Sequence, residues 1–152
     1  MKTLKGDLLE LASSGQFDVL VHGCNCQHTM GAGIAKQIKA RFPAAFKADL
    51  GTPKDASKLG TISTAIVRIS NHNLVVVNGY TQIQWRGSGT KLDYPALRSV
   101  MKHVKAQFAG LRIGYPKIGA GLAGGDWELI AAIINEELEG EDHSLVEYAP
   151  NT

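Results

Sequence analysis

The chain has 152 residues and a mass of 16.3 kDa, a size that fits one domain spanning residues 1–152 and excludes two of ordinary size. Hydrophobic residues make up 44% and charged residues 20%, a composition that excludes a disordered chain. No apolar run approaches the roughly 18 residues of a membrane span, and residues 1–7 lack the apolar core of a signal peptide. We therefore expect a cytoplasmic monomer with no membrane partner.

The net charge of +2 conceals an uneven distribution along the chain. Residues 1–125 contain all 16 Lys and Arg, whereas residues 126–152 contain eight acidic residues and no Lys or Arg. A basic body favours anionic ligands such as phosphates or nucleic acid. The alternative, which stays open at this point, is a solvated acidic helix on an otherwise neutral protein.

Hydrophobic periodicity and turn residues predict alternating strands and helices. The expected strands are residues 2–5, 19–21, 61–69, 74–80, 111–115 and 145–148, and the expected helices are residues 7–13, 32–42, 93–108 and 126–139. Residues 61–80 form a hairpin in this scheme, and the segment from Pro43 to Gly60 has no assigned element. Helices spread along such an order cover both faces of a mixed, mostly parallel sheet, so the predicted fold class is a three-layer α/β/α domain.

Two glycine-rich segments, residues 30–33 and 119–125, each open a predicted helix. Glycine lets a backbone approach a ligand closely, and the first N–H groups of a helix lack internal partners and favour phosphate. Two such loops at the carboxyl ends of neighbouring strands can hold a diphosphate between two helix N-termini. The second segment matches G-x-G-x-x-G, but too few residues follow for a dinucleotide-binding fold, and neither segment has the Lys-Ser/Thr end of a P-loop.

The alternating residues His22, Cys24, Cys26 and His28 suggest a zinc site by type, but their geometry in an extended chain opposes one. His22 and His28 would lie roughly 20 Å apart on a strand, so we expect no metal, no other cofactor and no disulfide between Cys24 and Cys26. The polar residues that gather near the two glycine segments are the candidates for chemistry. They are Asn25, Gln27, His28, Gln82 and Asp126. Asp126 also fits a helix cap.

Three segments, in this order and spacing, resemble the macro domain over nearly the whole chain. They are Gly6-Asp7-Leu8-Leu9, then His22-Gly23-Cys24-Asn25-Cys26-Gln27 with Met30-Gly31-Ala32-Gly33-Ile34-Ala35, and finally Tyr115-Pro116-Lys117-Ile118-Gly119-Ala120-Gly121-Leu122. The resemblance implies an ADP-ribose-binding α/β/α fold whose partners are ADP-ribose, its derivatives and ADP-ribosylated macromolecules.

The resemblance also implies roles for individual positions. Asp7, with the Leu8 backbone, corresponds to the adenine contact, and Asn25 corresponds to the contact with the distal ribose. The two phosphate loops correspond to Gly31, Ala32, Gly33 and Ile34, and to Ile118, Gly119, Ala120, Gly121 and Leu122.

Within the family, the sequence is most similar to the branch of ADP-ribose 1″-phosphate phosphatases and ADP-ribosylglutamate hydrolases. The lysine and aspartate that the glutamate hydrolases use correspond to Gln82 and Ala123, which cannot replace them. We therefore expect a phosphatase with Asn25, His28 and Asp126 as catalytic residues. Two alternatives remain, a non-catalytic reader of ADP-ribose or poly(ADP-ribose) and a hydrolase of ADP-ribosylated protein or nucleic acid.

Overall fold

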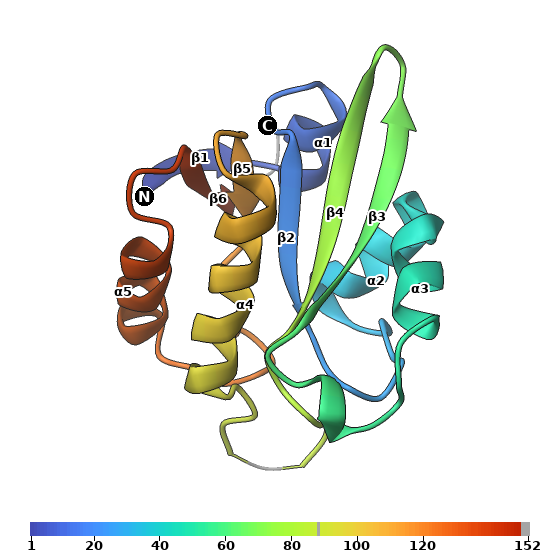
Figure 1. Ribbon diagram of the computed structural model, residues 1–152, viewed down its shortest axis with the longest axis vertical. Helices are drawn as coiled ribbons and strands as arrows, with labels where there is room; N and C mark the ends of the chain where they lie inside the picture. Colours follow the sequence, from blue (N-terminus) through green and yellow to red (C-terminus); the bar gives the residue numbers. More distant parts are fainter. Residues whose placement is uncertain (88, 150–152) are drawn as a thin grey trace.

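A six-stranded sheet runs through the molecule in the order β1-β6-β5-β2-β4-β3 (Figure 1). The computed structural model describes residues 1–87 and 89–149. The strands are β1 (Lys2–Gly6), β2 (Val19–Cys24), β3 (Ile62–Ile69), β4 (His72–Tyr80), β5 (Ile113–Tyr115) and β6 (His143–Tyr148). Neighbouring strands are parallel except β3 and β4, which form the predicted antiparallel hairpin. The prediction of a mixed, mostly parallel sheet is confirmed.

Helices cover both faces of this sheet (Figure 1). They are α1 (Leu8–Ser13), α2 (Gly33–Arg41), α3 (Pro43–Leu50), α4 (Tyr94–Phe108) and α5 (Trp127–Glu137), with a short 3-10 helix η1 (Ala56–Lys58). One face packs against α4 and α5, and the other packs against α1, α2 and α3. The three-layer α/β/α prediction is therefore confirmed. No helix among the described residues is long and apolar enough to cross a bilayer.

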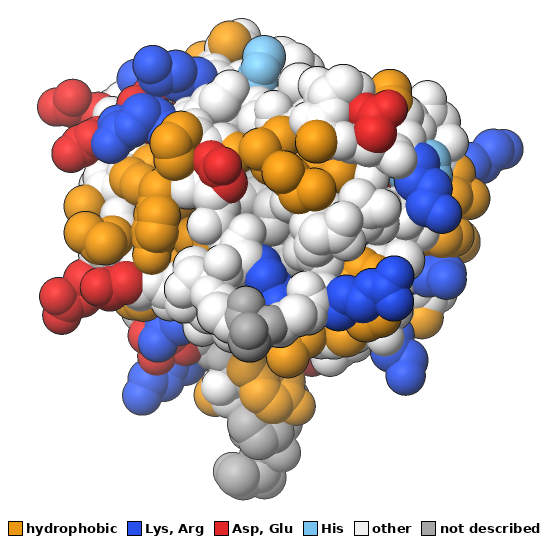
Figure 2. Space-filling model, turned by 90° about the horizontal axis from the view of Figure 1, so that it is seen from below, with side chains coloured by type: hydrophobic (Ala, Val, Ile, Leu, Met, Phe, Trp, Pro, Cys, Tyr) orange, Lys and Arg blue, Asp and Glu red, His pale blue; other side chains and the backbone are white. Residues whose placement is uncertain are grey.

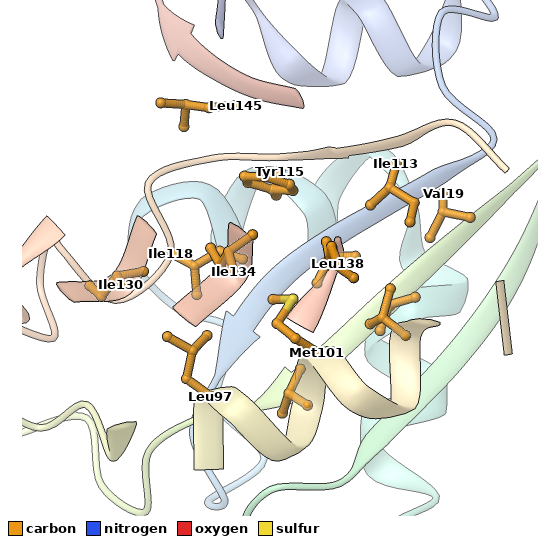
Figure 3. Close-up of a cluster of buried hydrophobic side chains, with 14 of the residues drawn as sticks. Val19, Leu97, Met101, Ile113, Tyr115, Ile118, Ile130, Ile134, Leu138 and Leu145 are labelled. Carbon is orange, nitrogen blue, oxygen red and sulfur yellow. The ribbon is translucent and has the colours of Figure 1, made fainter. Parts of the chain in front are cut away.

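Alternation along β2 divides the core between the two faces. Val19 and Val21 are buried with α4 and α5, whereas Leu20 is buried with α1, α2 and α3, because successive side chains of a strand point to opposite faces. Figure 3 shows the first of these clusters, in which Leu97 and Met101 of α4 lie with Ile130 and Ile134 of α5. The Asp93 carboxylate caps α4 by accepting from Ala96 N at 2.8 Å.

Helix α3 is missing from the sequence prediction. Pro43 follows the C-cap residue of α2 and occupies the first turn of α3, where its fixed φ suits a helix and its missing N–H is not needed. The helix buries Ala45 and Asp49, and its amphipathic pattern is too short to stand out between Pro43 and Gly51.

The connections after β2 and β5 leave these adjacent strands in opposite directions. The chain passes from β2 to α2 on one face and from β5 to α5 on the other. Where neighbouring parallel strands send their connections to opposite faces, a crevice opens at their carboxyl ends. The fold therefore places a candidate site between the loops that follow β2 and β5.

Candidate functional site

A cleft of about 510 Å³ lies at the carboxyl ends of β2, β4 and β5. Its lining comes from the end of β2, the start of α2 and the loops that follow β2, β4 and β5, and it comprises residues 23–25, 29, 31–35, 81, 82, 85, 116–119 and 121–123. Strand β2 points downward in Figure 1, so Figure 2 views the molecule from the side that its carboxyl end faces. The middle of this face is largely white, which denotes backbone and uncharged polar side chains, with a basic side chain visible near its centre and further Lys and Arg at the left and right edges. The glycine-rich segments of the lining agree with the white area in the middle of this view.

The N-terminus of α2 forms one wall of the cleft. Ala32, Gly33, Ile34 and Ala35 line it, and Ala32 at the N-cap position provides no side-chain cap. No described residue accepts a hydrogen bond from the N–H groups of Gly33, Ile34 or Ala35. Gly33 has φ of 57°, a backbone conformation that favours glycine. This wall therefore presents free donors and the positive end of a helix dipole.

The loop of residues 118–122 forms the opposite wall. Gly119 has φ of 73°, and a β-carbon there would lie 2.8 Å from the Leu92 side chain. No described residue accepts a hydrogen bond from the N–H groups of Gly119, Gly121 or Leu122, all of which line the cleft. Both predicted glycine segments therefore line the same cleft.

The prediction that two helix N-termini face the cleft holds for α2 and is wrong for α5. Helix α5 begins at Trp127, and none of its described residues lines the cleft. The Asp126 carboxylate accepts from Glu128 N at 2.9 Å, so α5 already has an anionic cap of its own. The second wall is therefore a glycine-rich loop without a helix dipole behind it.

Asn25 lies in the cleft, as predicted, with 8% of its surface exposed. Its amide nitrogen donates to Thr29 Oγ1 at 2.8 Å and to Thr29 O at 3.1 Å, and its Oδ1 accepts from Gln27 N at 2.9 Å. These bonds fold residues 25–29 into a tight loop. Asn25 therefore shapes the loop that lines the cleft.

His28 does not line the cleft. Its Nε2 donates to the carbonyl of Thr52 at 2.6 Å, and its φ of 57° turns the chain sharply. Histidine tolerates this left-handed conformation better than most residues. The structure therefore places His28 as an anchor between the 25–29 loop and the segment after α3.

Asp126 is exposed and also lies outside the cleft lining. Besides capping α5, it is fixed by Tyr94, whose hydroxyl oxygen accepts from Asp126 N at 2.9 Å. Of the three predicted catalytic residues, the structure therefore brings only Asn25 into the cleft.

The predicted adenine contact lies outside the cleft lining as well. Asp7 caps α1 by accepting from Leu9 N and Glu10 N at 3.0 and 3.1 Å, and Leu8 is buried in the core. Among the predicted phosphate-loop residues, Ala120 is the one that does not line the cleft. The remaining eight do, namely Gly31, Ala32, Gly33, Ile34, Ile118, Gly119, Gly121 and Leu122.

Sequence reasoning missed several cleft residues from the loops after β4 and β5. Trp85 lines the cleft with 50% of its surface exposed, Thr81 lies beside Gly23, and Lys117 follows β5. Gln82 and Ala123, which stand at the lysine and aspartate positions of the glutamate hydrolases, both line the cleft. All of these residues follow the ends of the parallel strands β4 and β5, and this position in the sequence could have identified them as cleft residues.

A buried polar cluster lies beside the cleft. His22 Nε2 donates to Asn78 Oδ1 at 2.7 Å, and Cys24 Sγ lies 3.8 Å from His22 Nδ1. Burial lowers the pKa of His22 to about 4, against a partial opposing effect of the Asn78 bond, and burial raises the pKa of the Cys24 thiol. Both side chains are therefore neutral at pH 7.

The second part of this cluster is an ion pair. Lys58 Nζ lies 3.4 Å from Asp49 Oδ1 and donates to Thr52 Oγ1 at 2.8 Å. Tyr80 donates its hydroxyl proton to Asp49 at 2.8 Å. Within residues 1–87 and 89–149, no group of three or more His, Cys, Asp or Glu side chains is placed to hold a metal ion.

Comparison with known proteins assigns this chain to a family. The family model described as Macro domain matches residues 21–134. An uncharacterized 17.5 kDa protein of Enterobacteria phage T4 is 32% identical over 156 residues, covering 99% of this chain and 97% of that protein. An ADP-ribose 1″-phosphate phosphatase of Meyerozyma guilliermondii is 43% identical over 44 residues, which are 29% of this chain and 25% of that protein.

Solved structures agree on the fold. The macrodomain of Thermus aquaticus DarG is 24% identical with a TM-score of 0.75, covering 98% of this chain and 97% of that chain. Thermosipho africanus DarTG, solved in complex with ADP-ribose, is 17% identical with a TM-score of 0.76, covering 97% of this chain and 41% of that chain. The family model spans most of the chain, and the phage relative spans nearly all of it, so this chain belongs to the Macro domain family.

Proposed function

We propose that the cleft binds ADP-ribose and that the protein removes the 1″-phosphate of ADP-ribose 1″-phosphate. One observation carries the binding proposal. Six residues that line one cleft, three from α2 and three from the 118–122 loop, have backbone N–H groups without partners among the described residues. Such donors, together with a helix N-terminus, stabilise a diphosphate.

One comparison supports ADP-ribose as the ligand, and another supports removal of its 1″-phosphate as the reaction. The DarTG protein of similar fold was solved in complex with ADP-ribose. The segment shared with the Meyerozyma phosphatase supports the phosphatase, and the presence of Gln82 and Ala123 in the cleft argues against glutamate deacylation.

Hydrolysis of the monoester requires water to attack phosphorus while the bond to the ribose oxygen breaks and that oxygen gains a proton. Backbone N–H groups would stabilise the phosphoryl oxygens, and Asn25 would orient the distal ribose. His28 would supply the proton to the ribose oxygen, and Asp126 would accept one from water. Both would act only after moving closer to the cleft than they lie in this structure.

A second candidate function is binding without turnover. It is favoured by one observation, that none of the described residues lining the cleft is Asp, Glu or His. A reader module requires no proton donor or acceptor at the ligand.

The decisive experiment measures binding and turnover separately. Calorimetry with ADP-ribose should give a 1:1 complex and a much weaker one with AMP, whose single phosphate engages only part of the cleft. Incubation with ADP-ribose 1″-phosphate should release inorganic phosphate, with roughly tenfold or larger losses in Asn25→Ala, His28→Ala and Asp126→Asn. Asp126→Asn retains a capping side chain, so it separates a catalytic role from a structural one. Binding without phosphate release would establish the reader, and no binding at millimolar ADP-ribose would refute both functions.

A further inference from the structure

The side chains that line the cleft carry a net positive charge. Within the lining that the structure describes, Lys117 is the one side chain charged at neutral pH, and no carboxylate accompanies it. The Cys24 thiol is neutral because burial raises its pKa. A single positive charge in a neutral cleft attracts anions without competition from a neighbouring acid.

The backbone holds Lys117 firmly at the base of the second wall. Ile118 N donates to Pro116 O at 2.7 Å, and Ala120 N donates to Lys117 O at 3.2 Å. Ile118 is buried and Tyr115, the last residue of β5, is fully buried, so both neighbours of this short turn are anchored in the core. The position of the Lys117 α-carbon is therefore fixed beside the donors of Gly119 and Gly121.

The Lys117 side chain itself has nothing to bind within the described chain. It is exposed, and its ammonium forms no hydrogen bond or ion pair with residues 1–87 or 89–149. The buried Lys58, by contrast, donates to Thr52 and pairs with Asp49. An ammonium on a flexible four-carbon stem can therefore turn toward a ligand at no cost in protein contacts.

We infer that Lys117 selects anionic ligands for this cleft by placing its ammonium against the ligand's diphosphate. The inference rests on the proposed binding of ADP-ribose. The six N–H groups are neutral donors that act only at short range, whereas the ammonium adds attraction over a Debye length. Lys117 thus strengthens the binding of nucleoside diphosphates and their derivatives relative to uncharged nucleosides.

The test compares three variants and two ligands at two salt concentrations. Lys117→Met removes the charge and keeps the stem, Lys117→Arg keeps the charge, and Lys102→Met is the matched control. Lys102 is an exposed lysine on α4 that lines a separate groove with Arg98 and Ile133. Affinity for ADP-ribose and for ADP is measured at about 0.1 M and about 1 M NaCl, where the Debye length falls from about 10 Å to about 3 Å.

We expect Lys117→Met to weaken both ligands by the same factor, roughly 3- to 10-fold at the lower salt and less than about twofold at the higher salt. Lys117→Arg and Lys102→Met should bind like the wild type. The salt dependence matters because a merely structural role of Lys117 would weaken binding equally at both concentrations.

The outcomes separate this inference from the proposed function. If the wild type binds neither ligand, the proposed function fails and the inference fails with it. If the wild type binds but Lys117→Met binds equally well, only the inference is overturned. A loss that is independent of salt, or that affects ADP-ribose but not ADP, also overturns it, because the charge would then not act on the diphosphate.

Discussion

At the scale of single residues, Thr81 combines burial with an unpaired polar atom. It is 1% exposed, and its Oγ1 has no hydrogen-bond partner among the described residues. A buried hydroxyl without a partner costs about 1–3 kcal/mol. We therefore expect Thr81→Val to raise the free energy of unfolding by about 1 kcal/mol, measured by urea denaturation of the ligand-free protein.

The control for this variant is Thr52→Val. Thr52 Oγ1 donates to Asp49 O at 2.6 Å and accepts from Lys58 at 2.8 Å, so its removal should lower stability. A loss of stability in Thr81→Val would show that its hydroxyl has a partner and would contradict the prediction.

The buried His22 predicts a pH dependence of stability. Burial lowers its pKa to about 4, whereas an unfolded histidine titrates near 6.5. Above pH 6.5 both states hold a neutral ring. Between pH 6.5 and 4 the unfolded chain binds more protons, so stability falls as pH falls, by up to about 3 kcal/mol.

We expect the melting temperature of the wild type to fall more steeply across this window than that of His22→Gln, which cannot titrate. Parallel curves for the two proteins would mean that His22 binds protons equally in the folded and unfolded states. Melting temperatures at several pH values between about 7 and 4 are the measurement.

At the scale of elements, the loop after β5 depends on one glycine and not on its neighbour. An alanine at position 119 would combine φ of 73° with a β-carbon 2.8 Å from Leu92. A β-carbon at Gly121 would meet nothing within 4 Å. Gly119→Ala should therefore lose about 1–3 kcal/mol of unfolding free energy and Gly121→Ala less than about 0.5, as measured by thermal or chemical denaturation. Equal losses would refute the geometric argument.

The segment that joins α3 to η1 depends on the buried pair of Asp49 and Lys58. Lys58 is 4% exposed and its Nζ lies 4.3 Å from the centre of the Tyr80 ring. Removing one partner leaves the other charge buried and unpaired, which costs about 3–5 kcal/mol. Lys58→Met should lose about that much stability.

A double variant isolates the effect of charge in this pair. Asp49→Asn combined with Lys58→Met leaves no unpaired charge, and the amide oxygen that replaces the carboxylate would still accept from the Tyr80 hydroxyl. The double variant should therefore be more stable than Lys58→Met alone. Additive losses in a double-mutant cycle would show that the two side chains do not interact.

At the scale of the whole molecule, charges that are separated in sequence are brought together in space. The acidic residues after Gly125 contact basic residues of earlier elements, with Arg98 near Glu136 and Glu137 at 2.7 and 2.8 Å, and Lys2 near Asp142 at 3.0 Å. The acidic C-terminal part is therefore a set of solvated helix and loop residues with surface ion pairs.

Ligand binding should stabilise the whole fold, because α2, β5 and the loops that follow β2 and β4 all contribute to one cleft. A ligand at about 100 times its dissociation constant adds about 2.7 kcal/mol, equivalent to roughly 5–10 °C in a domain of this size. We expect this rise with saturating ADP-ribose and a much smaller one with the same concentration of AMP. Equal melting temperatures with and without ADP-ribose would contradict the proposed function.

The sequence alone determined the fold class and most of the cleft. Periodicity identified β2, α4 and α5, and the glycines at positions 31, 33, 119 and 121 located both walls, because these signals are local. The hairpin β3–β4 likewise followed from two β-rich runs around a short turn.

Only the tertiary structure decided which polar side chains face the cleft. His28 and Asp126 are close to the glycine loops in sequence, yet His28 is held by Thr52 and Asp126 caps α5. Trp85 lies in no motif, and the motif that contains Lys117 gave that side chain no role, yet the parallel alignment of β5, β2 and β4 brings both residues to the cleft. A side chain's direction depends on partners that lie far away in the chain, and sequence spacing does not record them.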